Sequence, residues 1–150
     1  MVDALQRAHG WLRPTGCVLD AHPTAEPAYL EVQLAAGIVA VGRVNDIGGQ
    51  AGPSSRHARA DAALAAAVTR GWFAIEARSE FSFHRHADSV SEMRSHVQGK
   101  WKGAALDEIA LQQAATLQGA EPNARLWVRE QVGIARLRPL EQPGTRPVVS

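Results

Sequence analysis

Two pairs of polar residues are the side chains in this chain best suited to chemistry. Asp20 and His22 stand two residues apart directly after a short apolar stretch, and His84 and His86 have the same spacing in a long alternating segment. Imidazole titrates near neutral pH, so His22 and His86 are candidate general bases. Asp20, His84 and Trp101 are candidate substrate-binding residues. Asp20 and His22 are the favoured pair, because ligands of open α/β sheets sit at strand ends.

A metal site is a second interpretation of these pairs, because two histidines on one strand face have a feasible ligand spacing. If the two segments meet in the fold, two histidine pairs and a carboxylate could hold zinc or iron. No cysteine supports such a site, and we expect no metal. The simplest alternative is that these are polar residues at the rims of a sheet.

Two other segments have a chemical interpretation that their surroundings weaken. Trp101 lies between Lys100 and Lys102 and could stack on a base, but a packing aromatic is the stronger interpretation. The glycine-rich stretch 47–55 precedes a helical segment and could bind an anion through backbone N–H groups. Pro53 removes one donor and no lysine follows as in a P-loop, so a connector is favoured.

The elements that must position these residues follow from the spacing of apolar side chains. Helical spacing predicts helices over residues 2–12, 56–70 and about 106–117. A capping box that begins at Ser89 predicts the start of another helix. Predicted strands cover residues 17–19, 30–34, 38–41, 73–86 and 125–137, the second and third forming a hairpin.

Alternation assigns the side chains of the two long strands to faces. One face of the first long strand is expected to carry Phe73, Ile75, Ala77, Phe81 and Phe83. One face of the second is expected to carry Leu126, Val128, Val132 and Ile134. The helix, turn and buried strand at the start are typical of parallel sheets, whereas the end reads as antiparallel. The sequence therefore predicts an α/β to α+β fold: one domain over residues 1–140 with a single mixed sheet, and a loose tail over 141–150.

Composition narrows the class of protein. The chain has 150 residues, 45% of them apolar, which suits one globular domain. A net charge of +1 offers no field for nucleic acid or an anionic membrane, so neither is expected as a partner. The single cysteine favours a reducing compartment, and neither a signal peptide nor a membrane-length apolar run is recognisable. We expect a cytoplasmic protein.

Three segments in this order resemble the C-terminal half of class I, Rossmann-like SAM-dependent methyltransferases. Residues 4–16 resemble the helix and Leu-Arg-Pro-Gly-Gly turn before the fifth strand, with Thr15 in place of the first glycine. Residues 17–20 then match that strand. Residues 73–86 and 125–137 match the antiparallel sixth and seventh strands, and residues 87–93 resemble a helix start that many members insert between them.

The resemblance implies S-adenosyl-L-methionine as cofactor and a small-molecule substrate, but the chain has no recognisable strand followed by a Gly-rich cofactor turn. That half would be deleted, supplied by another chain, or encoded upstream. A truncated or partner-dependent form is therefore expected, as a homodimer or with a partner that completes the sheet beside residues 17–19. Two alternatives stay open: a non-catalytic subunit of a partner methyltransferase, and an unrelated ligand-binding protein with a cavity under Phe81 and Phe83.

Overall fold

The computed structural model describes residues 1–46, 56–101 and 103–141, and these residues form four helices and one six-stranded sheet. The α+β class and the single sheet are confirmed. The glycine-rich stretch 47–55 and residues 142–150 of the expected tail lie outside the described residues. In chain order the elements are α1 (Val2–Trp11), β1 (Val18–Pro23), β2 (Tyr29–Leu34), β3 (Gly37–Asp46), α2 (Arg56–Thr69), β4 (Phe73–Ala87), α3 (Val90–Lys100), β5 (Ala104–Leu106), α4 (Glu108–Ala120) and β6 (Arg125–Pro139).

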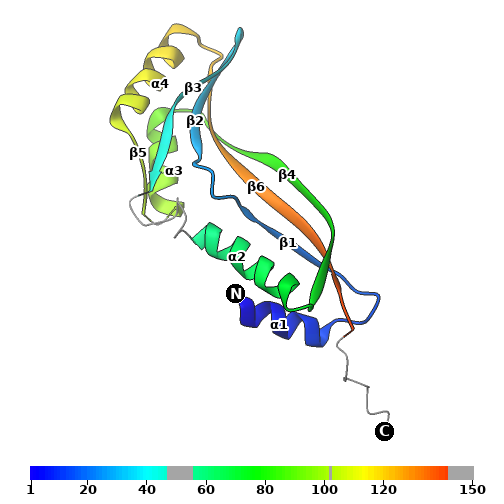
Figure 1. The fold of residues 1–150 in the computed structure, drawn as a ribbon. Coiled ribbons are helices and arrows are strands. Elements are labelled where there is room, and N and C mark those ends of the chain that lie inside the picture. Colours follow the sequence, from blue (N-terminus) through cyan, green and yellow to red (C-terminus); the bar gives the residue numbers. More distant parts are fainter. Residues whose placement is uncertain (47–55, 102, 142–150) are drawn as a thin grey trace.

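The long strand β6 organises the sheet. Along one edge it pairs with β4 over the full length of both strands, and the two run side by side in Figure 1. Along its other edge it pairs first with β2, through residues 125–129, and then with β1, through residues 132–137. From β2 the sheet continues through β3 to β5. β6 is therefore the strand that joins the two ends of the molecule.

Every strand pair within the described residues is antiparallel, as expected for the C-terminal strands. The parallel strand expected after the first turn is a wrong prediction, because β1 lies antiparallel to β6. β1 also extends to Pro23, so Asp20 and His22 lie inside the strand and not after it. Leu19, expected to be buried, is 66% exposed because no helix covers its side of the strand.

One hydrophobic core lies where α3 and α4 pack on the sheet, over the start of β6; we call this end the α3/α4 half. Its buried members include Leu30 and Val32 of β2, Met93 and Val97 of α3, and Leu126 and Val128 of β6. Gly42 of β3 lets α4 come close, because a Cβ atom there would overlap the side chain of Ala110. We call the side of the sheet buried here the Val128 face.

A second core lies where α1 and α2 pack on the other end of the sheet; we call this the α1/α2 half (Figure 1). Its buried members include Leu5 of α1, Leu64 and Ala67 of α2, Phe73 of β4, and Ala135 and Leu137 of β6. Successive residues of a strand point to opposite faces, and Leu137 follows Val128 by an odd number of residues. The second core therefore lies on the opposite side of the sheet, which we call the Leu137 face.

A β-bulge in β4 changes which residues share a face. Ile75 pairs with Leu137, whereas Ala77 pairs with Arg136, so Glu76 is the extra residue. Phe73 and Ile75 therefore lie on the Leu137 face, while Ala77, Phe81 and Phe83 lie on the Val128 face. The prediction that all five share one face is wrong, because the extra residue at the bulge shifts the alternation of every residue that follows it.

Side-chain capping contacts set the starts of α3 and α4. The Ser89 hydroxyl accepts from the Glu92 amide at 3.1 Å, and the Glu92 carboxylate accepts from the Asp88 amide at 2.9 Å. The Asp107 carboxylate accepts from the Ile109 amide at 2.8 Å and starts α4 at Glu108, later than expected because Leu106 belongs to β5. No helix among the described residues has the length and apolar content needed to cross a membrane.

Candidate functional site

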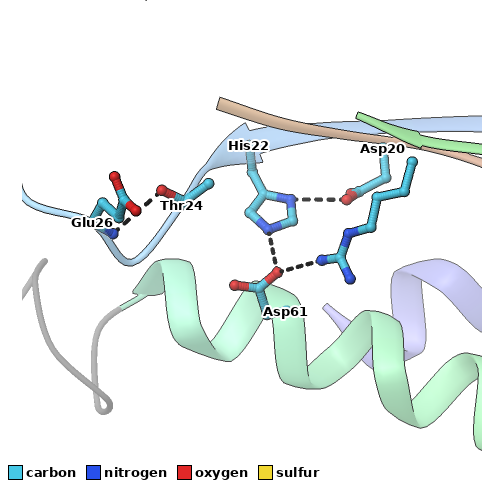
Figure 2. A network of polar contacts seen from close by, with 6 residues as sticks. Asp20, His22, Thr24, Glu26 and Asp61 are labelled. Atoms are coloured by element: carbon cyan, nitrogen blue, oxygen red, sulfur yellow. Dashed lines mark hydrogen bonds and ion pairs between the residues drawn. The ribbon is translucent and has the colours of Figure 1, made fainter. Parts of the chain in front are cut away.

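The candidate pair Asp20 and His22 lies on β1, on the side of the sheet that α2 covers. Asp20 pairs with Ala135 and His22 with Gly133, so both side chains point from the Leu137 face towards α2. Asp61, in the second turn of α2, points towards them (Figure 2). The strand alternation and the docking of α2 in its own core thus bring the three side chains together.

The His22 imidazole bridges two carboxylates. Its Nδ1 lies 2.8 Å from Asp20 Oδ2, and its Nε2 lies 3.2 Å from Asp61 Oδ1 (Figure 2). Arg78 of β4 donates from a terminal guanidinium nitrogen to the same Asp61 oxygen at 3.2 Å. The network therefore joins β1, α2 and β4, and its side chains become more exposed from His22, at 14%, to Arg78, at 54%.

Both nitrogens of the His22 ring are engaged within this network. Each lies within hydrogen-bonding distance of a carboxylate oxygen of the same chain, one on β1 and one on α2. The ring therefore acts as a clamp between strand and helix. The expectation that His22 is a general base stays a prediction.

The other candidate residues lie away from this network. Glu80 of β4 is in the row of His22, since both pair with Gly133, and His86 lies six residues further along β4. At about 3.3 Å per residue that is on the order of 20 Å, so the two histidine pairs do not meet. His86 Nε2 lies 3.2 Å from Asp88 Oδ1 in an exposed ion pair. The role of His86 as a base likewise stays a prediction.

His84 and Trp101 both make packing contacts. The His84 ring lies edge-on against Trp127, with ring centroids 4.8 Å apart. Trp101, at the end of α3, packs against the core of the α3/α4 half. The proposed roles of both residues in substrate binding stay predictions, since these contacts account for their positions without a ligand. No group of three or more His, Cys, Asp or Glu side chains within the described ranges is arranged to hold a metal ion.

A second polar cluster lies on the Leu137 face in the α3/α4 half, where no helix covers that side. Glu31 is only 5% exposed and accepts from Arg129 Nε at 2.7 Å. The guanidinium groups of Arg129 and Arg43 lie 5.0 and 5.5 Å from the centre of the Tyr29 ring. The sequence offered one signal for this cluster, which is the position of Glu31 within an apolar strand. A buried glutamate needs a cation as its partner.

One described pocket, of about 340 Å³, lies beside the turn from α4 into β6. Its lining residues are Gln33, Leu34, Ala35, Glu121, Asn123 and Arg125. The Glu121 carboxylate accepts from the Ala35 amide at 2.6 Å and so ties this turn to the β2–β3 hairpin. The pocket and the His22 network belong to opposite halves of the molecule.

The Val128 face is bare in the middle of the sheet. Leu19, Phe81 and Phe83 are 66, 47 and 43% exposed, and their pairing with Arg136, Val132 and Glu130 puts all three on this face. Val132 and Ile134 of β6 lie between them and are half-buried. We call these five residues the central patch. No family model matches the chain, and no curated protein or solved structure is detectably similar to it.

Proposed function

We propose that this chain is a non-catalytic assembly subunit that associates with another copy of itself through the middle of its sheet. The observation that carries the proposal is the central patch, which holds three large exposed apolar side chains on a part of the Val128 face that no helix covers. Contiguous apolar surface on a soluble domain marks sites of protein association more often than single exposed residues do.

The edges of the sheet add to this support. Between residues 75 and 86, β4 is exposed apart from the half-buried Arg85, and its outer edge pairs with no described strand. The unpaired N–H and C=O groups of such an edge can pair with another chain. The β4 part of the central patch, Phe81 and Phe83, thus lies beside free backbone groups, and association along this edge would bring both side chains against a second copy.

The His22 network favours an assembly role over catalysis for the residues ranked first by sequence. Both nitrogens of the His22 ring already face carboxylate oxygens of the same chain, and these contacts support the position of α2. A general base needs a free lone pair within reach of a substrate proton. We therefore assign Asp20, His22 and Asp61 to the fold and not to a reaction.

The methyltransferase hypothesis stays a prediction beside this proposal. β4 and β6 pair antiparallel over their whole length, which is the arrangement that the resemblance implies for its last two strands. Titration of the purified chain with S-adenosyl-L-methionine and S-adenosylhomocysteine tests it. Binding at micromolar affinity would mean that the chain rebuilds a cofactor site and would overturn the non-catalytic proposal, whereas a folded chain that binds neither supports it.

Analytical ultracentrifugation over a range of chain concentrations tests the assembly proposal directly. The double variant Phe81→Ser/Phe83→Ser is expected to shift the chain to monomer, because it removes the apolar side chains nearest the free edge. Ile109→Ser is the matched control, since Ile109 is 69% exposed but lies on α4. A wild-type chain that is monomeric at about 100 µM, well above a typical micromolar Kd, contradicts the proposal, as does equal weakening by the control.

A further inference from the structure

We propose that two copies of the chain pair antiparallel along β4, with the two-fold axis at Ser82, so that two sheets become one. This inference rests on the proposed assembly function and gives it a strand, a direction and a register. It follows from three observations: the free edge of β4, the symmetry that any two-fold strand pairing must obey, and the order of charged and aromatic residues along the strand.

The free edge of β4 is long enough for a second strand. β4 has 15 residues, and in Figure 1 it runs along one margin of the sheet, beside β6. The bulge at Glu76 interrupts the alternation of side chains only near the start of β4. Residues 77–87 stay in continuous register with β6. Native proteins usually blunt long edges, and this stretch holds neither proline nor a further bulge.

Symmetry limits the registers to a few. A two-fold axis perpendicular to the sheet keeps each face continuous between the copies. An odd-numbered residue of one strand must then lie opposite an odd-numbered residue of the other, and an even-numbered residue opposite an even-numbered one. The axis must therefore lie midway between the two copies of a single residue. Near the middle of residues 77–87, which keep a continuous register, the choices are Phe81, Ser82 and Phe83.

The axis at Ser82 gives the best match of side chains. Phe81 of each copy then lies opposite Phe83 of the other, which makes two cross-strand aromatic pairs on the Val128 face. On the Leu137 face, Glu80 lies opposite His84 of the second copy, and among the described residues neither has an ion-pair partner in its own chain. Arg78 lies opposite His86, and each of these keeps its own carboxylate partner, Asp61 and Asp88.

The two neighbouring registers are poorer. With the axis at Phe81, Glu80 lies opposite Ser82 and each Phe83 lies opposite Ser79. With the axis at Phe83, Glu80 lies opposite His86, whose ring already has Asp88 as its carboxylate partner. Only one aromatic pair forms in either case. Of the three registers, only the one at Ser82 makes two aromatic pairs and places Glu80 opposite a histidine that has no carboxylate partner among the described residues.

Single-cysteine cross-linking tests the register. In a Cys17→Ser background, which removes the native exposed thiol, Ser82→Cys is expected to form a disulfide-linked dimer under mild oxidation. Directly opposed residues of antiparallel strands have Cα atoms about 4.5–5.5 Å apart, within disulfide range. Phe81→Cys and Phe83→Cys in the same background are expected to cross-link much more slowly. Faster linkage at residue 81 or 83 than at residue 82 overturns the proposed register.

Charge reversal provides a second measurement that does not depend on oxidation. Glu80→Lys places a cation opposite His84 of the second copy and is expected to weaken the dimer, whereas Glu80→Lys/His84→Glu is expected to restore it. Circular dichroism checks that both variants fold. Equal weakening by the single and the double variant overturns the pairing of these two residues.

Leu19→Ser separates failure of this inference from failure of the assembly function. Leu19 lies in β1, on the far side of β6 from β4, so edge pairing predicts an unchanged dimer. If Leu19→Ser abolishes the dimer, the copies pack face to face on the central patch: the β4 inference is then wrong while the assembly function stands. If the wild-type chain is monomeric, both are wrong.

Discussion

The two halves of the sheet share the strand β6 but bury opposite faces of it. In the α3/α4 half Leu126 and Val128 are buried, whereas in the α1/α2 half Ala135 and Leu137 are buried. Residues 129–134 between them are half-buried. Because its side chains alternate, one strand that is longer than either core can contribute to both cores. Where the buried side of the strand changes, neither face is completely covered. Val132 and Ile134 of the central patch lie in this part of β6.

The largest expected effect comes from removing one anchor from each core. Leu126→Ala and Leu137→Ala are each expected to destabilise the chain by about 2–5 kcal/mol, because both side chains are fully buried. Val132→Ala, from the half-buried stretch between them, is expected to cost markedly less. Urea unfolding of the three variants measures the difference. Equal losses at all three positions would mean that the change of buried face is absent.

The buried ion pair of the α3/α4 half comes next. Arg129→Ala leaves the Glu31 carboxylate buried without its cation, and we expect a loss of about 3 kcal/mol, the low end for a broken buried pair because Arg129 is 29% exposed. Arg136→Ala is the control in the α1/α2 half, where the pair with Glu76 is solvated and a loss below about 1 kcal/mol is expected. Similar losses in thermal or urea unfolding would contradict the contrast.

The close approach of α4 to β3 is the next target. Gly42→Ala adds a methyl group where Ala110 already lies, and overpacking of this kind costs about 1–3 kcal/mol. Gly99→Ala on α3 meets nothing within 4 Å and is expected to stabilise the helix by about 0.5–1 kcal/mol. Opposite shifts in Tm are expected, and a neutral Gly42→Ala would mean that α4 is not held closely against the sheet.

In the α1/α2 half, the clamp between β1 and α2 gives a smaller effect. His22→Gln removes the ring that bridges Asp20 and Asp61, and we expect a loss of roughly 1 kcal/mol, since Asp61 is partly solvated. His86→Gln breaks only the exposed pair with Asp88 and is expected to leave stability unchanged. Hydrogen exchange of the α2 amides should increase in the first variant alone. No difference between the two would argue against a clamp.

The smallest effect concerns His96 on α3. Burial lowers the pKa of His96 below its ordinary value of 6.5, and the nearby Arg85 and Lys100 lower it further, with Glu92 opposing. The unfolded chain therefore takes up this proton more readily, so the stability that the neutral ring contributes is present above pH 6.5 and is lost as the pH falls below it. Urea unfolding over a pH series should show a shallower decline for His96→Gln. Parallel curves would contradict the lowered pKa.

Much of the local structure could be predicted from single residues. The capping box at Ser89 starts α3 where expected, and Gly71, with a φ of 70°, ends α2 in the left-handed region where glycine is favoured. The alternating runs also marked the two long strands within a residue or two of their ends. These features depend on contacts between near neighbours in the chain, which is why the sequence carries them.

The candidate site was predicted only in part. Asp20 and His22 were singled out because both are polar and follow an apolar run, and the structure places their side chains together. Asp61 was missed because an aspartate in an alanine-rich helix looks like any solvated position. The expected meeting of the two histidine pairs failed for a geometric reason: His22 lies in the row of Gly133, whereas His84 and His86 lie further along β6, in the rows of Arg129 and Trp127.

By itself, the sequence determined most of the helices and strands, although not the short β5, and where most of them begin, because capping, glycine freedom and alternation act over a few residues. Only the tertiary structure decided which face of β6 is buried at each end, because that depends on where helices distant in the chain settle. It also decided the partners of the charged groups: Glu31 meets Arg129 and His22 meets Asp61 across 98 and 39 residues of chain. Such pairs form because burial makes an unpartnered charge costly, a cost that exists only once the chain has folded.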